Sequence, residues 1–248
     1  MYGVIPSPPP DTSSIVTKIG GEEHQVTTVE SHDLVVLVSP LPSADKLKAT
    51  RKNLIAHQRV LEEVLASHTL LPLRFGIAAD NAQQVQDLMA RNAESIKSQL
   101  NALEGKVEMS LKAMWKDMQA VFQEIVADNA QIQRQREKAA KGKLSHDGQI
   151  ELGKQVEQAL REKQDKQQEE MLSGLRPLAE EVAVQEPIGD NMCLNAAFLI
   201  RREQEPAFDE AVNALGDRYE GQMDFKYVGP LPVYNFITLD LQWEGQPQ

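Results

Sequence analysis

Hydrophobic and polar positions alternate over the first forty residues, and this alternation predicts short strands. Residues 2–5, Ile15–Ile19, Gln25–Glu30 and Leu34–Val38 are rich in β-branched side chains and are separated by Gly, Pro, Asp and Ser. We interpret them as strands of one sheet. Because Leu34–Val38 is apolar throughout, we expect this strand to be buried on both of its faces.

Two helical patterns follow. Ser43 is a suitable N-cap, and the helix expected after it ends near His68 and carries an apolar stripe of Leu47, Leu54, Leu61, Val64 and Leu65. A second helix is expected from about Asp80 to Gly105, with apolar residues three or four apart at Val85, Leu88, Met89, Ile96, Leu100 and Leu103. Between the two helices lies an apolar, strand-like segment that a proline interrupts, Leu70–Gly76.

The middle of the chain changes from a strand pattern to a polar helical pattern. Val107–Trp115 alternates between apolar and polar residues, which predicts a half-buried strand. From Lys116 the spacing becomes helical, and residues 134–170 are dominated by Gln, Lys, Arg and Glu. A helix without an apolar face must stand in solvent or meet a polar partner. We therefore expect a helical hairpin around residues 116–183 that projects from the body of the protein.

The last quarter of the chain predicts three strands and one short amphipathic helix. In chain order these are the strand Leu194–Arg201, the helix Pro206–Leu215 and the strands Gly221–Val228 and Tyr234–Trp243. Together with the strand at 107–115, the order is β, long α, β, α, β, β. This order is close to a ferredoxin-like unit with a helical insertion and a changed second half.

The predicted fold class is therefore α+β with two domains. We assign residues 1–105 to an N-terminal α+β domain. We assign residues 106–248 to a C-terminal, modified ferredoxin-like domain that contains the long helical insertion.

A proline-rich turn near the C-terminus, flanked by aromatic residues, is the strongest candidate for a functional surface. We call residues 227–236, Tyr-Val-Gly-Pro-Leu-Pro-Val-Tyr-Asn-Phe, the elbow. Each proline lacks a backbone N–H, so the segment must be a sheet edge, a bulge or a bend. Aromatic rings on a rigid backbone suit a contact surface, because little conformational entropy is lost on binding. The predicted partner-contact residues are Tyr227, Pro230, Leu231, Pro232 and Tyr234. The alternative is that the aromatic residues close the core of the second domain, with no role in binding.

Charge and cysteine content limit the possible partners and compartment. Lys and Arg number 26 against 37 Asp and Glu, a net charge of −11, which argues against binding to nucleic acid or to anionic lipid. A single cysteine, Cys193, cannot form an internal disulfide, so we expect a reducing cytoplasm. The N-terminus has neither the basic region nor the apolar run of a signal peptide, and no stretch approaches the ~20 apolar residues of a membrane span.

Residues that could carry out chemistry are scattered. The five histidines show no zinc-ligand spacing, and no nucleophile stands beside a base, so we predict no enzyme activity, no metal and no cofactor. His57 is expected to be a packed or capping imidazole, and Cys193 a small hydrophobe in a strand. Arg74 interrupts an apolar segment, and it either pairs with a buried carboxylate or faces a partner.

Two segments resemble the F/L family of gas vesicle accessory proteins. One is Leu71-Pro-Leu-Arg-Phe-Gly76, with His57 upstream, and the other is the elbow. The family pattern in the elbow is similar to Gly-Pro-Trp-Pro-Pro-Tyr followed by Phe, so this chain departs from it at Leu231 and Val233. The Met-Tyr-Gly opening, the length and the order of the domains also fit, so the resemblance covers essentially the whole chain.

The resemblance implies a minor structural or assembly component of gas vesicles, the hollow, protein-walled organelles that give aquatic microbes buoyancy. Its implied partner is the small, hydrophobic major shell protein, which it would hold from aggregating while the vesicle nucleates, and further partners are other gas vesicle accessory proteins. The implied location is the gas vesicle and the cytoplasm. An alternative from another class is a small-molecule-binding regulatory protein with a ferredoxin-like sensor domain, although a fold alone does not define a function.

Overall fold

The computed structural model describes residues 1–41 and 47–242 and shows a mixed helix-and-sheet protein of two compact units. The first unit holds Met1–Met109, Leu199–Glu203 and the chain from Gly229 onward, and the second holds Ser110–Phe198 and Gln204–Val228. Residues from Gly229 onward, which the sequence analysis assigns to the second domain, thus group with the first unit. The domain boundary at Gly105 stays a prediction.

The first unit contains a four-stranded antiparallel sheet in the order β4-β5-β1-β6. Its strands are β1 (Gly3–Pro6), β4 (Thr27–Ser31), β5 (Leu34–Val38) and β6 (Leu71–Pro72). The prediction that all the early strands share one sheet is wrong. β2 (Val16–Thr17) and β3 (His24–Gln25) form a separate two-stranded sheet, because Gly20 and Gly21, at φ of 80° and 96°, turn the chain after two strand residues.

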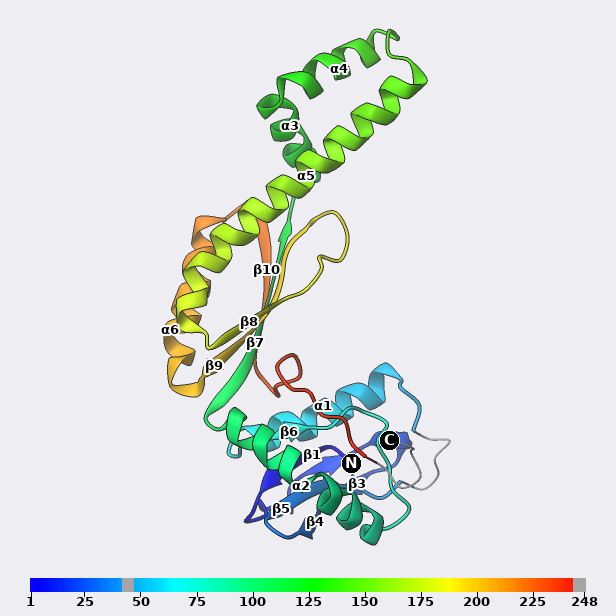
Figure 1. The fold of residues 1–248 in the computed structure, drawn as a ribbon, viewed down its shortest axis with the longest axis vertical. Helices are drawn as coiled ribbons and strands as arrows, with labels where there is room; N and C mark the ends of the chain where they lie inside the picture. Colours follow the sequence, from blue (N-terminus) through cyan, green and yellow to red (C-terminus); the bar gives the residue numbers. More distant parts are fainter. Residues whose placement is uncertain (42–46, 243–248) are drawn as a thin grey trace. The chain divides into compact units, whose positions relative to one another are not determined.

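Two helices cover the two faces of the four-stranded sheet, α1 (Arg51–Leu65) and α2 (Ala82–Leu103). Figure 1 shows them on opposite sides of the strands. Leu34 and Val36 face the core beneath α2, whereas Val35 and Leu37 point to the other face, and all four side chains are buried. The expected burial of this strand on both faces is confirmed.

The helix α1 begins later than its apolar pattern predicts. Its N-cap is Thr50, whose hydroxyl accepts a hydrogen bond from the Asn53 backbone N–H at 3.3 Å. Leu47 therefore precedes the helix, and the predicted N-cap Ser43 lies outside the described residues. Leu54 is also not on the buried stripe, because 44% of it is exposed. The buried positions are Asn53, His57, Val60, Leu61, Val64 and Leu65.

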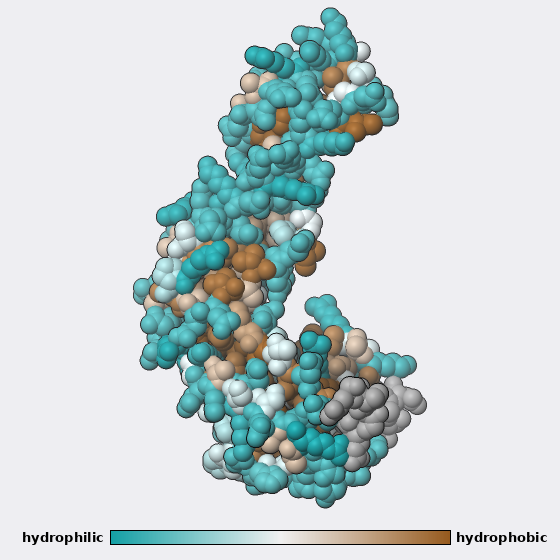
Figure 2. Space-filling model, viewed as in Figure 1, coloured by the Kyte–Doolittle hydropathy of each residue, from teal (hydrophilic) through white to brown (hydrophobic). Residues whose placement is uncertain are grey.

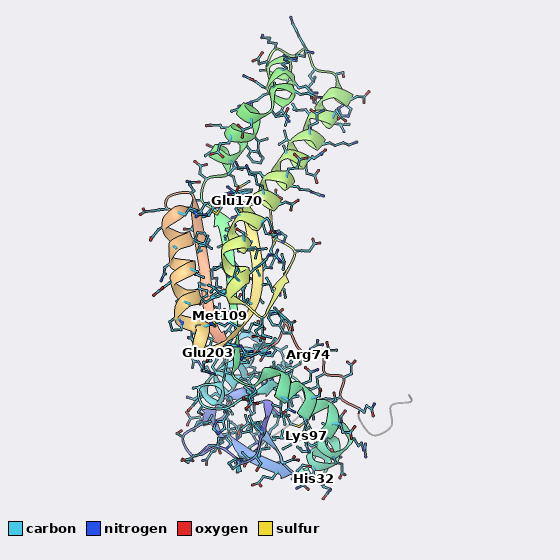
Figure 3. All side chains as sticks on the ribbon, turned by 60° about the vertical axis from the view of Figure 1, so that its left-hand side comes forward. His32, Arg74, Lys97, Met109, Glu170 and Glu203 are labelled. Atoms are coloured by element: carbon cyan, nitrogen blue, oxygen red, sulfur yellow. The ribbon has the colours of Figure 1, made fainter. Side chains whose placement is uncertain are left out.

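The helix α2 and its apolar stripe are confirmed. Its N-cap is Asn81, and the predicted apolar positions from Val85 to Leu103 are all buried against the sheet. Polar contacts fix the helix over the turn between β4 and β5. Ser31 Oγ donates to the Gln86 carbonyl at 3.3 Å, and Lys97 forms an ion pair of 2.7 Å with Asp33. Lys97 and His32 mark this end of the unit in Figure 3.

A second four-stranded sheet has the order β10-β7-β9-β8. Its strands are β7 (Lys106–Trp115), β8 (Glu181–Val184), β9 (Met192–Arg201) and β10 (Met223–Leu231). In the second unit, α5 (His146–Leu175) and α6 (Glu205–Arg218) lie side by side on one face of this sheet (Figure 1). The Phe198 ring on β9 packs against Phe208 on α6, with 5.0 Å between ring centroids. Tyr219 donates to Glu170 on α5, which Figure 3 labels.

The predicted helical hairpin is present as three helices, α3 (Met118–Asp128), α4 (Ala130–Ala140) and α5. The break between α3 and α4 was not predicted. It occurs at Asn129, whose side chain accepts hydrogen bonds from the Gln131 and Ile132 backbone N–H groups and so starts a new helix. Ile132 and Leu160 provide buried apolar side chains within the hairpin.

In the second half of the chain one strand was not predicted, and one predicted strand is not formed. The strand β8 was missed, because its residues are half-buried or exposed and the sequence analysis assigns them to the returning helix. The predicted strand Tyr234–Trp243 is not formed, since residues 232–242 have no strand structure and Trp243 lies outside the described residues. The elbow instead begins inside β10, an edge strand, as its prolines require.

None of the helices in the described ranges is both long and apolar enough to cross a membrane.

Gly229 permits a close approach of the chain to Met109, which a side chain at this position would crowd. A Cβ atom at this position would collide with Met109 Sδ and would lie 3.3 Å from the Glu108 carbonyl oxygen. Met109, labelled in Figure 3, is itself buried. We expect Gly229→Ala to lower the free energy of unfolding by about 1–3 kcal/mol through overpacking, measured by urea unfolding.

A double-mutant cycle isolates this contact. In a Met109→Ala background the cost of Gly229→Ala should shrink, because the colliding sulfur is gone. An undiminished cost in that background would contradict the steric explanation.

Candidate partner-contact surface

The elbow is anchored to the first unit by one buried carboxylate. Glu108 on β7 is 3% exposed, and its Oε2 accepts hydrogen bonds from the backbone N–H groups of Tyr234 and Asn235, both at 2.9 Å. The Asn235 side-chain amide donates to Oε1 of the same carboxylate. A buried charge is tolerated when hydrogen-bond donors satisfy it. Glu108 therefore fixes the backbone of the elbow where a strand partner would otherwise do so.

Apolar side chains next to this anchor complete the core of the first unit. Pro232 is buried, and Val233 is 1% exposed and belongs to the cluster beneath α2. Beyond the elbow, further partly buried apolar residues pack against the same cluster, namely Phe236, Ile237, Leu239 and Leu241. The inner side of the elbow is therefore core.

The segment that follows the elbow is held by a second buried polar side chain. Asn92 on α2 accepts a hydrogen bond from the Gln242 backbone N–H at 3.0 Å and donates to the Gln242 carbonyl at 3.3 Å. It also donates to the Leu88 carbonyl at 2.7 Å. Side chains thus bond the backbone of Tyr234, Asn235 and Gln242, three residues that a strand would have paired in a ladder, and the segment 232–242 is irregular.

The outer side of the elbow presents Tyr234 to solvent beside α1. The Tyr234 side chain is among the exposed large apolar groups, with 36% of the residue exposed, and its hydroxyl donates to Gln58 Oε1 at 3.3 Å. Partial burial of the side chain and the negative charges of Glu108 and Glu62 raise the pKa of Tyr234. Leu54 lies one helical turn before Gln58 and is 44% exposed. Figure 2 shows hydrophobic surface over this part of the first unit.

The predicted contact residues do not all belong to one unit. Pro230, Leu231, Pro232 and Tyr234 lie in the first unit, whereas Tyr227 lies in the second. The Tyr227 hydroxyl donates to Asp209 on α6 at 2.5 Å, and its ring lies 6.2 Å from that of Phe208. Burial and the Asp209 carboxylate raise the pKa of Tyr227. The side chain of Tyr227 is therefore engaged with α6.

Arg74 lies in the segment Leu71–Gly76 and His57 lies upstream of it, and the two residues differ in burial. Arg74 follows β6 and is exposed (Figure 3), and it forms no ion pair with another residue in the described ranges. A partner contact requires an exposed side chain, as Arg74 has, whereas pairing with a buried carboxylate would require a buried one. His57 is 4% exposed, and its Nε2 lies 3.0 Å from the Leu73 carbonyl, to which the neutral ring donates. The expectation that His57 is packed is confirmed.

A cavity of about 650 Å³ lies in the first unit beside His57. Tyr2, Ser39, His57 and Phe75 are among the residues that line it. Their polar atoms already have protein partners, because the Tyr2 and Ser39 hydroxyls lie 2.6 Å apart and His57 bonds to Leu73. The His57 ring also stacks on Tyr2 at 5.1 Å and meets the edge of Phe75 at 5.6 Å. These contacts make His57 part of the scaffold.

Two observations concern metal ligands and the single thiol. Among them, no group of three or more His, Cys, Asp or Glu side chains converges as a metal site would require. Cys193 is fully buried in β9, and burial raises the pKa of its thiol to about 12, so the thiolate nucleophile is not formed near neutral pH.

Sequence reasoning missed both polar anchors of the elbow region. Glu108 stands between the apolar residues Val107 and Met109, so strict alternation would place it on a solvated face. Asn92 offered a clearer signal, because it stands four residues after Leu88 and four before Ile96 on the apolar stripe of α2. A polar side chain in the middle of such a stripe predicts a buried hydrogen-bonded residue.

Comparison with known proteins finds relatives over nearly the whole chain. Residues 1–238 match the family described as gas vesicle synthesis protein GvpL/GvpF. Gas vesicle protein F of Microcystis aeruginosa is 31% identical over 243 residues, which cover 96% of this chain and 97% of the relative. The crystal structure of GvpF from Microcystis aeruginosa matches with a TM-score of 0.79 and 29% identity, covering 96% of this chain and 98% of the other. That of GvpF from Anabaena sp. PCC7120 matches with a TM-score of 0.83 and 27% identity, covering 96% and 97%.

Replacing the anchor should loosen the elbow. In Glu108→Gln the neutral amide replaces a carboxylate that accepts three N–H groups, so the free energy of unfolding should fall by about 1–3 kcal/mol. Hydrogen exchange at the Tyr234 and Asn235 amides should accelerate. The matched control is Glu104→Gln, at an exposed carboxylate in the same unit, which should change stability by less than about 0.5 kcal/mol. Equal effects of the two substitutions would contradict the anchoring role.

Stability should also depend on pH through His57. Burial lowers the pKa of His57 below its ordinary value of 6.5, so the unfolded chain binds the proton more tightly than the folded one. The contribution of His57 is therefore fully present above about pH 6.5 and is lost as the pH falls below that value. Between pH 7.5 and 5.5 the wild type should lose more unfolding free energy than His57→Gln, which cannot titrate. Parallel stability curves for the two proteins would rule out this linkage.

Proposed function

Because the chain belongs to the gas vesicle synthesis protein GvpL/GvpF family, we propose that it is an accessory protein of gas vesicles that binds the hydrophobic shell protein. In this proposal it limits aggregation of the shell protein while the vesicle nucleates. It acts at the gas vesicle and in the cytoplasm around it, and other gas vesicle accessory proteins are further partners. The family match over residues 1–238 is the observation that carries the proposal.

The outer side of the elbow is the surface that we propose for shell-protein contact. Tyr234 and Leu54 expose apolar groups there, and Glu108 and the core side chain Val233 hold the backbone beneath them. A rigid, partly exposed aromatic side chain can bury apolar area on binding without a large loss of side-chain entropy. The net charge of −11 would keep a complex with an apolar client dispersed in water.

A regulatory protein that binds a small molecule is the second candidate, and the cavity beside His57 is the observation that favours it. A ligand site usually offers polar groups that converge on the ligand. The hydroxyls of Tyr2 and Ser39 and the ring of His57 already bond to protein atoms, which favours the assembly role over the sensor role.

For the second sheet we propose a ferredoxin-like arrangement with a helical insertion. The chain order is β7, three helices, β8, β9, α6 and β10, and the sheet order β10-β7-β9-β8 supports the proposal. In such a unit the two middle elements of the sheet are the first and third strands of the chain, as they are here.

Binding to the major shell protein tests the proposed function. We expect Tyr234→Ala and Leu231→Asp to weaken capture of the shell protein about tenfold, since each removes or repels apolar contact at the elbow. The measurement is a pull-down with this chain as bait, together with light scattering of the shell protein as it is diluted from denaturant.

Phe122→Ala is the matched control, because this aromatic residue on α3 is 38% exposed, close to the exposure of Tyr234. It should bind as the wild type does. If Tyr234→Ala lowers the melting temperature strongly while its folded fraction still captures the shell protein, the elbow is core alone and the proposed contact surface is wrong.

A further inference from the structure

A groove on the first unit combines cations with apolar side chains in a protein whose net charge is negative. It lies between α1 and β2 and has a volume of about 580 Å³. Its cations are Lys18, Arg51, Lys52 and Arg59, and its apolar lining includes Val16 and Ile55. The whole chain, by contrast, carries a net charge of −11. This local reversal of charge favours contact with negatively charged groups.

The apolar residues of the groove are exposed in the structure. Val16 is 54% exposed and Ile55 is 43% exposed, among the largest exposures of apolar side chains in the described ranges. Lys18 forms an ion pair of 2.7 Å with Glu23, whereas Arg51, Lys52 and Arg59 form none with other residues among 1–41 and 47–242. Exposed apolar area flanked by unpaired cations favours an occupant with both apolar and acidic side chains.

The spacing of the groove residues on α1 indicates the shape of that occupant. Arg51, Ile55 and Arg59 follow one another at intervals of four residues, so they lie in a row on one face of the helix. The two arginines are therefore about 12 Å apart along the helix axis, at a rise of 1.5 Å per residue. A single small anion cannot reach both. A helix with an acidic, an apolar and an acidic side chain at the same intervals matches the whole row.

We propose that this groove binds an acidic amphipathic helix of a partner protein. The apolar side chains of that helix would pack on Ile55 and Val16, and its carboxylates would pair with Arg51 and Arg59 on either side. This is the helix-in-groove mode of peptide recognition with a charged rim. The site goes beyond the proposed shell-protein contact, which uses Leu54 and Tyr234 on the neighbouring side of α1.

A synthetic peptide tests the proposal on the full-length protein. The probe is a fluorescein-labelled, lactam-stapled helix with Glu, Leu and Glu at intervals of four, and its binding is measured by fluorescence anisotropy. Arg51→Glu/Arg59→Glu should weaken binding about tenfold or more, because two ion pairs become two repulsions. Ile55→Asp should also weaken it, whereas Ile55→Leu should retain it.

The chain supplies a control with the same change of net charge. Arg134→Glu/Arg136→Glu reverses two exposed arginines on α4 and should leave peptide binding unchanged. All the altered side chains are exposed, so melting temperatures should stay close to that of the wild type and confirm folding. Binding of the shell protein, measured in parallel, separates a failure of this site from a failure of the elbow.

Several results would overturn the proposal. They are no binding of the peptide to the wild type, equal loss in the groove and α4 variants, and equal binding of a peptide of the same composition with its apolar residues scrambled. Capture of the wild type by vesicles of anionic lipid, lost in Arg51→Glu/Arg59→Glu while the peptide does not bind, would assign the groove to a lipid surface instead.

Discussion

The buried carboxylate of Glu108 is the interaction on which the arrangement of the first unit depends. It accepts N–H groups from residues more than one hundred positions later in the chain and so brings the elbow back onto the N-terminal core. Its position is energetically demanding, because a buried carboxylate without donors would be strongly disfavoured. Apolar contacts alone could hold the elbow in several registers, whereas the carboxylate selects the one in which both consecutive amides reach it.

Much of the fold follows from periodicity, and the exceptions have identifiable physical causes. The strand Leu34–Val38 was predicted because burial on both faces requires a continuous apolar run. The buried face of α2 was predicted because it requires apolar residues three or four apart. The strand predicted at Tyr234–Trp243 has a strand-like composition, but its backbone is bonded by Glu108 and Asn92. Such side-chain anchors act over long separations in sequence, and no local pattern records them. The elbow was predicted as a candidate site because proline and aromatic residues are local signals in the sequence. The hydrogen bond of Tyr227 to Asp209 is a tertiary contact, and no local pattern predicts it.

The helix α1 shows how one element serves both packing and binding. Its buried side contains His57, Leu61 and Val64, and the guanidinium of Arg202 donates to the Leu65 carbonyl near its C-terminal end at 2.7 Å. Its exposed sides present Leu54, one turn before the Gln58 that Tyr234 bonds, and Ile55 in the basic groove. Because Leu54 and Ile55 are consecutive, their side chains point about 100° apart around the helix. One rigid support can therefore carry two surfaces of different chemistry.

The first unit is built from both ends of the chain, and this has a consequence for synthesis on the ribosome. Residues 110–198 and 204–228 form a unit of their own, so the segments needed for the second unit emerge before the chain from Gly229 onward. Glu108 and the cluster that contains Val233 meet their C-terminal partners only after that last segment has left the exit tunnel. Domains commonly fold in the order in which they are synthesised. In this protein the N-terminal sheet is made first, and the unit that contains it is completed last.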